Sequence, residues 1–141
     1  MIDIGDFGPD LSLHDQHGNL RALYSQDIAG VSNALFFIDD KTQDGLEAAL
    51  AAIVRGFSAN LSRPVAITRL MPEQALSSAT AVGIDFPVLS DPDAAMMTAI
   101  AGGRPSRPFA AAVFDRNGRL LGAGIDDNLG NLIGGAAEMC T

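Results

Sequence analysis

The sequence contains a single cysteine, a single lysine and no tryptophan among its 141 residues. One cysteine excludes an intramolecular disulfide and a cysteine-based zinc site. The scarcity of tryptophan and tyrosine disfavours stacking platforms for nucleic-acid bases. A formal charge of −8 disfavours binding to phosphate backbones and to anionic lipid. We therefore expect neither nucleic acid nor a membrane surface as a partner.

Long apolar runs are absent as well, because no stretch approaches the ~20 uncharged apolar residues that a membrane span needs. The first residues are acidic and lack the basic region of a signal peptide. An apolar content of 48% is nevertheless enough to build the core of one domain. We expect a single domain over residues 1–141, in a soluble cytoplasmic protein.

The hydrophobic pattern predicts an α/β protein, because buried-strand signals alternate with helical ones. Continuous apolar runs, typical of strands covered on both faces, lie at 33–38, 65–68 and 109–114. Helical spacing of apolar residues lies at 46–57, 72–82 and 129–136, and Asp91 with Pro92 predicts the start of a further helix. Turn residues at 14–18 and 115–118 predict an early and a late hairpin. We expect a central mixed sheet with helices on both faces.

Four stretches of the chain carry a family resemblance. They are residues 5–18, residues 34–37 (Ala-Leu-Phe-Phe), residues 83–92 (Gly-Ile-Asp-Phe-Pro-Val-Leu-Ser-Asp-Pro, the most specific of the four) and residues 112–120. In this order, over most of residues 5 to 125, they resemble the peroxiredoxins of the alkyl hydroperoxide reductase/thiol-specific antioxidant group. The resemblance implies a thioredoxin-like α/β fold with an N-terminal β-hairpin.

The reactive turn departs from that family's pattern, which reads Pro-x-x-x-Thr-x-x-Cys. Aligned on Thr42, the proline position is Ile38 and the cysteine position is Gly45, so only the threonine remains. The family also uses an arginine shortly before the last hairpin, and Arg107 is the nearest match. Thr42, Gly45 and Arg107 are therefore vestigial motif positions. Peroxide reduction in this family needs a thiolate activated at a helix N-terminus, and the sulfur is missing there.

The resemblance places Gly45 at the start of the first long helix, where free N–H groups need partners. We expect Asp44 to cap this helix. The alternatives are that Thr42 receives these N–H groups, or that an external anion binds them at the positive end of the helix dipole. Thr42, Asp44 and Arg107 are the candidate binding residues at this position.

Cys140 is the only residue that could replace the missing sulfur. It follows Glu138 and lies beside the C-terminal carboxylate, and negative surroundings raise the pKa of a thiol and lower its reactivity. We expect a tail residue, with a redox role as the alternative.

Other polar and sulfur-containing side chains have a structural interpretation that we favour over a functional one. His14 and His17 are expected to be solvated turn residues rather than metal ligands. Asp39, Asp40 and Asp44 could hold a hard cation, but local capping is the simpler role. Met96 and Met97 are expected to fill the core. We predict no metal and no cofactor.

Three functions remain open from the sequence. The first is a degenerate peroxiredoxin-like domain without thiol peroxidase chemistry, which binds a protein partner or a second copy of itself. The second is an antioxidant-class oxidoreductase that uses Cys140. The third is a different enzyme built around Asp39, Asp40, Asp44 and Arg107, for which a raised carboxyl pKa would be the sign.

Overall fold

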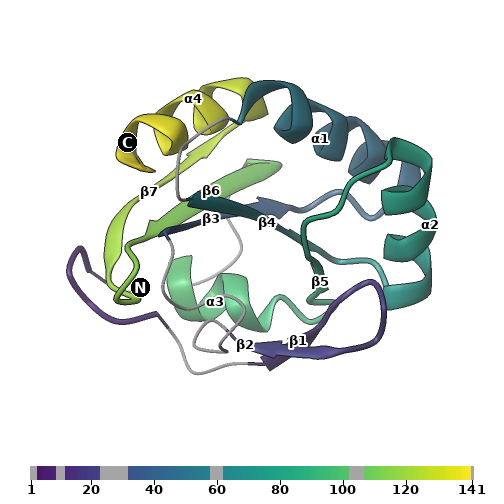
Figure 1. Ribbon diagram of the computed structural model, residues 1–141, viewed down its shortest axis with the longest axis horizontal. Helices are drawn as coiled ribbons and strands as arrows, with labels where there is room; N and C mark the ends of the chain where they lie inside the picture. Colours follow the sequence, from purple (N-terminus) through teal and green to yellow (C-terminus); the bar gives the residue numbers. More distant parts are fainter. Residues whose placement is uncertain (1–2, 9–11, 23–31, 58–61, 102–106, 141) are drawn as a thin grey trace.

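The computed structural model describes residues 3–8, 12–22, 32–57, 62–101 and 107–140. In this part of the chain, seven strands form one mixed sheet and four helices flank it (Figure 1). The strands are β1 (Ser12–His14), β2 (Leu20–Ala22), β3 (Ser32–Ile38), β4 (Ser62–Thr68), β5 (Val88–Ser90), β6 (Phe109–Phe114) and β7 (Leu120–Asp126). The helices are α1 (Gln43–Gly56), α2 (Pro72–Val82), α3 (Ala95–Ala101) and α4 (Leu129–Cys140).

The strand order is β2-β1-β5-β4-β3-β6-β7, with β3 inside the sheet. Strands β3, β4 and β5 are parallel, while β6 and β7 add on antiparallel beside β3. The register pairs Ile38 with Thr68 and Thr68 with Ser90. The residues that follow these three strands therefore emerge at the same edge of the sheet, where ligands bind in many α/β folds.

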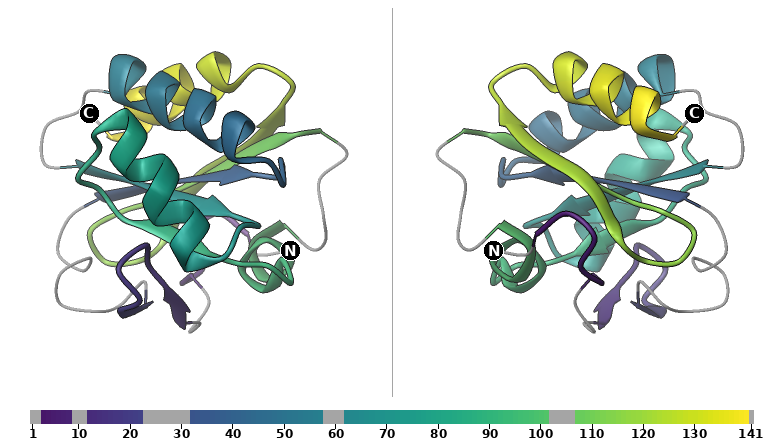
Figure 2. Two further views of the ribbon diagram at one scale, coloured as in Figure 1. Left: turned by 90° about the vertical axis from the view of Figure 1, so that its right-hand side faces the viewer. Right: turned by 90° about the vertical axis from the view of Figure 1, so that its left-hand side faces the viewer.

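Two apolar cores lie on opposite faces of the sheet. Helices α1, α2 and α4 supply the core on one face and α3 supplies the core on the other, as Figure 2 shows from two sides. The second core contains Met96 and Met97, both buried, which confirms their expected role as core residues. Strand side chains alternate between the two faces, so both sides of the central strands are covered.

The expected mixed sheet with helices on both faces is confirmed, and so are the strand runs and the two hairpins. Gly18 and Gly118 take positive φ angles of 81° and 83° in the hairpin turns, a conformation that favours glycine. Helix α2 has the predicted bounds and ends at Gly83, which is left-handed with φ 80°. Residues 25–30, whose sequence predicts a short turn or loop, lie outside the described residues.

The predicted start of α3 is wrong. Asp91 and Pro92 lie in a turn, and α3 begins at Ala95 after Ala94 takes a left-handed conformation with φ 56°. The Asp91 carboxylate nevertheless caps the helix, since it accepts hydrogen bonds from the amides of Ala95 and Met96 at 2.8 and 3.1 Å. The cap residue is thus as expected, but the helix begins three residues later than predicted, after an additional turn.

The turn of the first hairpin is held by Asp15, whose residue surface is 1% exposed. Its carboxylate accepts hydrogen bonds from the amides of His17 and Asn19 and from Nε of Arg21, each at 2.9 Å. Burial alone would raise the pKa of this carboxyl, but the hydrogen bonds from Asn19, Arg21 and His17 outweigh it and lower that pKa below its ordinary value.

Gln16 connects the same turn to the rest of the sheet through two hydrogen bonds. Its Nε2 donates to the carbonyl of Phe86 at 3.1 Å, and its Oε1 accepts from the amide of Val88 at 2.8 Å. Both contacts are buried, so the hairpin is docked on β5 by a side chain that satisfies two backbone groups.

No helix in the described ranges has the length and apolar character needed to cross a bilayer.

Candidate functional site

The turn between β3 and α1 contains the vestigial motif positions. Thr42 is extended, with φ −107° and ψ 148°, and its Oγ1 accepts a hydrogen bond from the amide of Gly45 at 3.1 Å. This makes Thr42 the N-cap of α1 and places Gly45 at the third helical position. The expectation that Asp44 caps the helix is wrong, because Asp44 lies within the first turn and a capping oxygen must precede it.

Asp40 occupies the space in front of the helix. Its Oδ1 accepts hydrogen bonds from the amide of Thr42 at 2.8 Å and from Oγ1 of Thr42 at 2.7 Å. A Cβ placed on Gly45 would overlap with the Asp40 carboxylate. A negative side chain of the protein therefore lies where the side chain of residue 45 would project, at the positive end of the α1 dipole.

Asp-x-Thr before a helix is a weak sequence signal for this arrangement, since it is typical of a turn that closes on a side-chain oxygen. This contact within the turn is the local role expected for Asp40, rather than that of a cation ligand. Within the described ranges, no group of three or more histidine, cysteine, aspartate or glutamate side chains is arranged to hold a metal ion. His14 and His17 are exposed residues of the first hairpin.

Arg107 lies just before β6, near the end of β3, since the carbonyl of Pro108 accepts a hydrogen bond from the amide of Asp39 at 3.0 Å. Its guanidinium donates to Asp127 at 2.8 Å, and the two side chains are 51% and 68% exposed. The neighbouring Asp126 has its pKa held below the ordinary value, mainly by the hydrogen bond from the amide of Asn128. Arg107 is thus paired at the turn before α4.

The last helix carries Cys140 away from this region. The side chain of Cys140 lies outside the described residues, but the backbone of α4 ends at this residue. A Cβ on Gly122 would meet the side chain of Met139, so the last turn of α4 lies over Gly122. Asp126, by contrast, is level with Ile38 across β6. Four residues of strand separate Gly122 from Asp126, which is about 13 Å.

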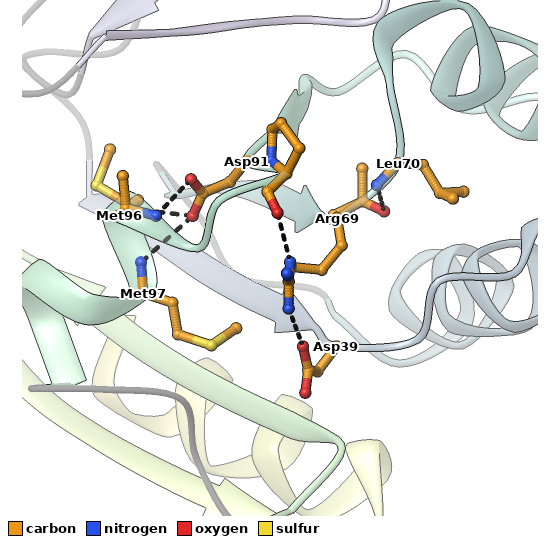
Figure 3. Close-up of polar contacts among 9 residues, drawn as sticks. Asp39, Arg69, Leu70, Asp91, Met96 and Met97 are labelled. Atoms are coloured by element: carbon orange, nitrogen blue, oxygen red, sulfur yellow. Dashed lines mark hydrogen bonds and ion pairs between the residues drawn. The ribbon is translucent and has the colours of Figure 1, made fainter.

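Sequence reasoning missed Arg69, which joins the loops at this edge of the sheet (Figure 3). Its Nη1 lies 3.1 Å from Oδ1 of Asp39, and its Nε donates to the carbonyl of Pro92 at 2.9 Å. The side chains of Arg69 and Asp39 are 11% and 12% exposed. Because β3 and β4 are parallel and Ile38 pairs with Thr68, the next residues, Asp39 and Arg69, become neighbours. The loops after β3, β4 and β5 are thereby connected through one guanidinium.

Comparison with solved structures shows that this architecture is similar to that of several known proteins. The peroxidoxin BcpB from Mycobacterium tuberculosis is 19% identical, with a TM-score of 0.82 over 99% of this chain and 97% of that one. The bacterioferritin comigratory protein of Xanthomonas campestris, whose structures address its alkyl peroxide reduction activity, is 17% identical, with a TM-score of 0.70 over 92% and 90% of the two chains. A candidate protein disulfide isomerase from Bacteroides thetaiotaomicron is 18% identical, with a TM-score of 0.67 over 99% and 91%.

No protein-family model and no curated protein sequence matches the chain. The structural likenesses show a thioredoxin-like fold of the peroxiredoxin type. The fold expected from the sequence resemblance is therefore confirmed.

Proposed function

We propose that this chain is a peroxiredoxin-like interaction module without thiol peroxidase chemistry. The observation that carries the proposal is the start of α1, where Gly45 has no side chain and the Asp40 carboxylate occupies the space in front of it. A thiol peroxidase needs an atom there that can accept oxygen from a peroxide. A thiolate does so by becoming a sulfenic acid, whereas a carboxylate has no corresponding oxidation step.

The partners of the polar groups support the same proposal. Thr42 accepts from Gly45 and donates to Asp40, and Arg107 is paired with Asp127. These groups are already engaged within the chain, and the negative Asp40 carboxylate in front of the helix disfavours a second anion there. We expect a protein partner, and neither nucleic acid nor membrane, because the chain carries a net charge of −8. A single cysteine fits work in a reducing compartment such as the cytoplasm.

A peroxide-consumption assay tests the proposal directly. We expect the unaltered protein and the Cys140→Ser variant to consume hydrogen peroxide and an alkyl hydroperoxide at the same rate, in the presence of fresh dithiothreitol. That rate should not exceed the rate with an equal concentration of free cysteine, because Cys140 is the only thiol in the chain. Turnover above that level that disappears in Cys140→Ser would establish the oxidoreductase alternative instead.

A second prediction tests the position of the Asp40 carboxylate. In the unaltered background, Gly45→Ala is expected to lower the free energy of unfolding by about 0–2 kcal/mol. The gain in helix propensity is about 1 kcal/mol. It is offset by the hydrogen bonds that Asp40 loses when the new Cβ displaces it, at about 0.5–1.5 kcal/mol each. In an Asp40→Ala background only the gain remains, so Gly45→Ala should stabilise the protein by about 1 kcal/mol.

Chemical denaturation of the four proteins of this double-mutant cycle gives the coupling energy, expected at about 1–3 kcal/mol. Gly134→Ala in α4 is the matched control, because no other group lies within 4 Å of a Cβ at that helical position. It should stabilise both backgrounds equally. A coupling of zero between positions 40 and 45 would show that Asp40 does not occupy the space in front of Gly45.

A further inference from the structure

Helix α4 packs against β6 and β7 but has little helix propensity of its own (Figure 2). It contains three glycines, and each glycine weakens a helix relative to alanine. Its contacts with the core come from Leu129, Ile133 and Ala136, which are buried and all precede the last turn. The last turn therefore depends on contacts of its own with the sheet, because a helix of this composition is stable mainly through packing.

The last turn contacts β7 through Met139. Its Sδ and Cε lie 2.7 and 2.9 Å from the position that a Cβ on Gly122 would take. Apart from the chain neighbours of Gly122, no other atom of the described residues lies within 4 Å of that position. Gly122 is buried although it has no side chain of its own. The thioether of Met139 thus packs directly on the backbone of β7, and only a glycine at position 122 leaves room for it.

The same side chain is open to small molecules in solution. Met139 is 42% exposed, whereas Met96 and Met97 are 0% and 2% exposed. Met71 is 49% exposed, but it lies at the N-cap of α2 rather than over β7. Among the described methionines, Met139 therefore combines access from solvent with a packing contact that holds the end of a helix.

We propose that Met139 is a site of reversible oxidation by hydroperoxides, and that its oxidation releases the last turn of α4 from β7. The thioether sulfur attacks the terminal oxygen of the hydroperoxide, so that an S–O bond forms and the O–O bond breaks. The sulfur is oxidised to a sulfoxide. The peroxide is reduced to water or an alcohol, whose oxygen takes up the proton of the transferred hydroxyl. The sulfoxide is polar, so it packs less well than the thioether on a buried strand.

This site goes beyond the proposed interaction module and does not use the turn at Gly45. Each Met139 consumes one hydroperoxide, and its return to the thioether requires a separate methionine sulfoxide reductase. The reaction is therefore no catalytic removal of peroxide. It converts the presence of a hydroperoxide into a structural change where α4 meets β7.

Hydrogen peroxide added to the Cys140→Ser protein tests the proposal without interference from the thiol. Peptide mass spectrometry should find added oxygen on Met139 and Met71, which are exposed. The buried Met96 and Met97 should take up much less oxygen. Hydrogen exchange at the amides of the last turn of α4 should then become about tenfold faster. Treatment with methionine sulfoxide reductases should reverse the change.

Two leucine variants in the same background separate the exposed methionines. Met71→Leu should keep the faster exchange after peroxide treatment, because Met139 is still present. Met139→Leu should abolish the response, since leucine has no sulfur to accept oxygen. A Met139 that resists oxidation as Met96 does, or an oxidised Met139 with unchanged exchange in α4, would overturn the proposal.

Gly122→Ala gives a second test that needs no oxidant. The described atoms that its Cβ overlaps belong to the flexible end of Met139, which can move aside. Exchange in the last turn should therefore rise by about the same factor, about tenfold, before peroxide is added, and peroxide should add little to it. Gly134→Ala is the matched control, because no other described group lies within 4 Å of a Cβ there, and it should leave the response to peroxide unchanged. Equal behaviour of the two variants would contradict the proposed contact.

Discussion

Replacing Arg69 by methionine is expected to lower the free energy of unfolding by about 2–4 kcal/mol. Methionine has a similar length but no hydrogen-bond donor. Asp39 therefore loses its contact with the guanidinium, and the carbonyl of Pro92 loses its hydrogen-bond donor. The loss is costly because the side chains of Arg69 and Asp39 are almost buried. Asp39 has a further interaction in the fold, which keeps the cost below that of a fully isolated buried charge. Because Arg69 connects three loops, the loss should loosen all of them.

The chain offers a matched control in Arg107→Met, which breaks an ion pair whose side chains are 51% and 68% exposed. Exposed pairs contribute about 0–1 kcal/mol, so this variant should be nearly as stable as the unaltered protein. Urea denaturation followed by far-UV circular dichroism measures both variants, and this signal does not depend on the missing tryptophan. Arg69→Lys should fall between them, because an ammonium group keeps the charge but not the fork geometry. Equal costs for Arg69→Met and Arg107→Met would contradict the role we assign to Arg69.

Replacing Asp15 by alanine is expected to cost about 2–3 kcal/mol at neutral pH. The carboxylate holds the first hairpin turn by accepting from two backbone amides and from Arg21, and alanine can accept from none of them. Loss of this turn also weakens the docking of Gln16, the next residue, on β5. Asp15→Asn keeps one acceptor oxygen and should cost less, about 1–2 kcal/mol.

The cost of Asp15→Asn should depend on pH in one direction. The pKa of Asp15 is lower in the folded protein than its ordinary value of about 3.9, so folding favours the ionised carboxylate. The stabilisation that the ionised carboxylate provides is complete at pH values above the ordinary pKa. It is lost as the pH falls through the lower pKa of the folded protein. The stability difference between the unaltered protein and Asp15→Asn should therefore be constant from neutral pH to about pH 5 and shrink below about pH 4.

Urea denaturation at a series of pH values measures this difference. Asp127→Asn is the control for removing one negative charge, since Asp127 is 68% exposed and its pair with Arg107 is a surface contact. It should change stability by less than about 0.5 kcal/mol at neutral pH. A difference for Asp15→Asn that grows toward acid would mean that the hydrogen bonds of the turn do not favour the ionised form.

Much of the fold could be predicted from the sequence because its signals are local. The apolar runs of β3 and β6 are covered on both faces, and Gly83 and Gly118 mark places where the chain needs positive φ angles. The start of α3 could not be predicted in this way. Alanine has no preference for a left-handed conformation, so nothing in the local sequence announces the turn at Ala94.

For the candidate site, the sequence predicts the missing catalytic group better than it predicts which side chains are in contact. The missing sulfur at Gly45 follows from the motif alone. The filling of that space by Asp40 depends on a side-chain conformation, which the sequence does not specify. Arg69 and Asp39 are thirty residues apart, and they meet only because parallel strands bring the residues after them to one edge. The pair could be predicted by combining the register of the parallel strands with the charged residues that follow each strand.

The docking of Gln16 on β5 has a consequence for the order in which the chain assembles. Its two hydrogen bonds reach residues 70 and 72 positions later in the sequence. During synthesis the first hairpin therefore leaves the ribosome long before Phe86 and Val88 exist. Contacts of such large sequence separation form late, because a long loop must close first. The N-terminal hairpin, although made first, is locked into the sheet only after β5 has been translated and has paired with β4.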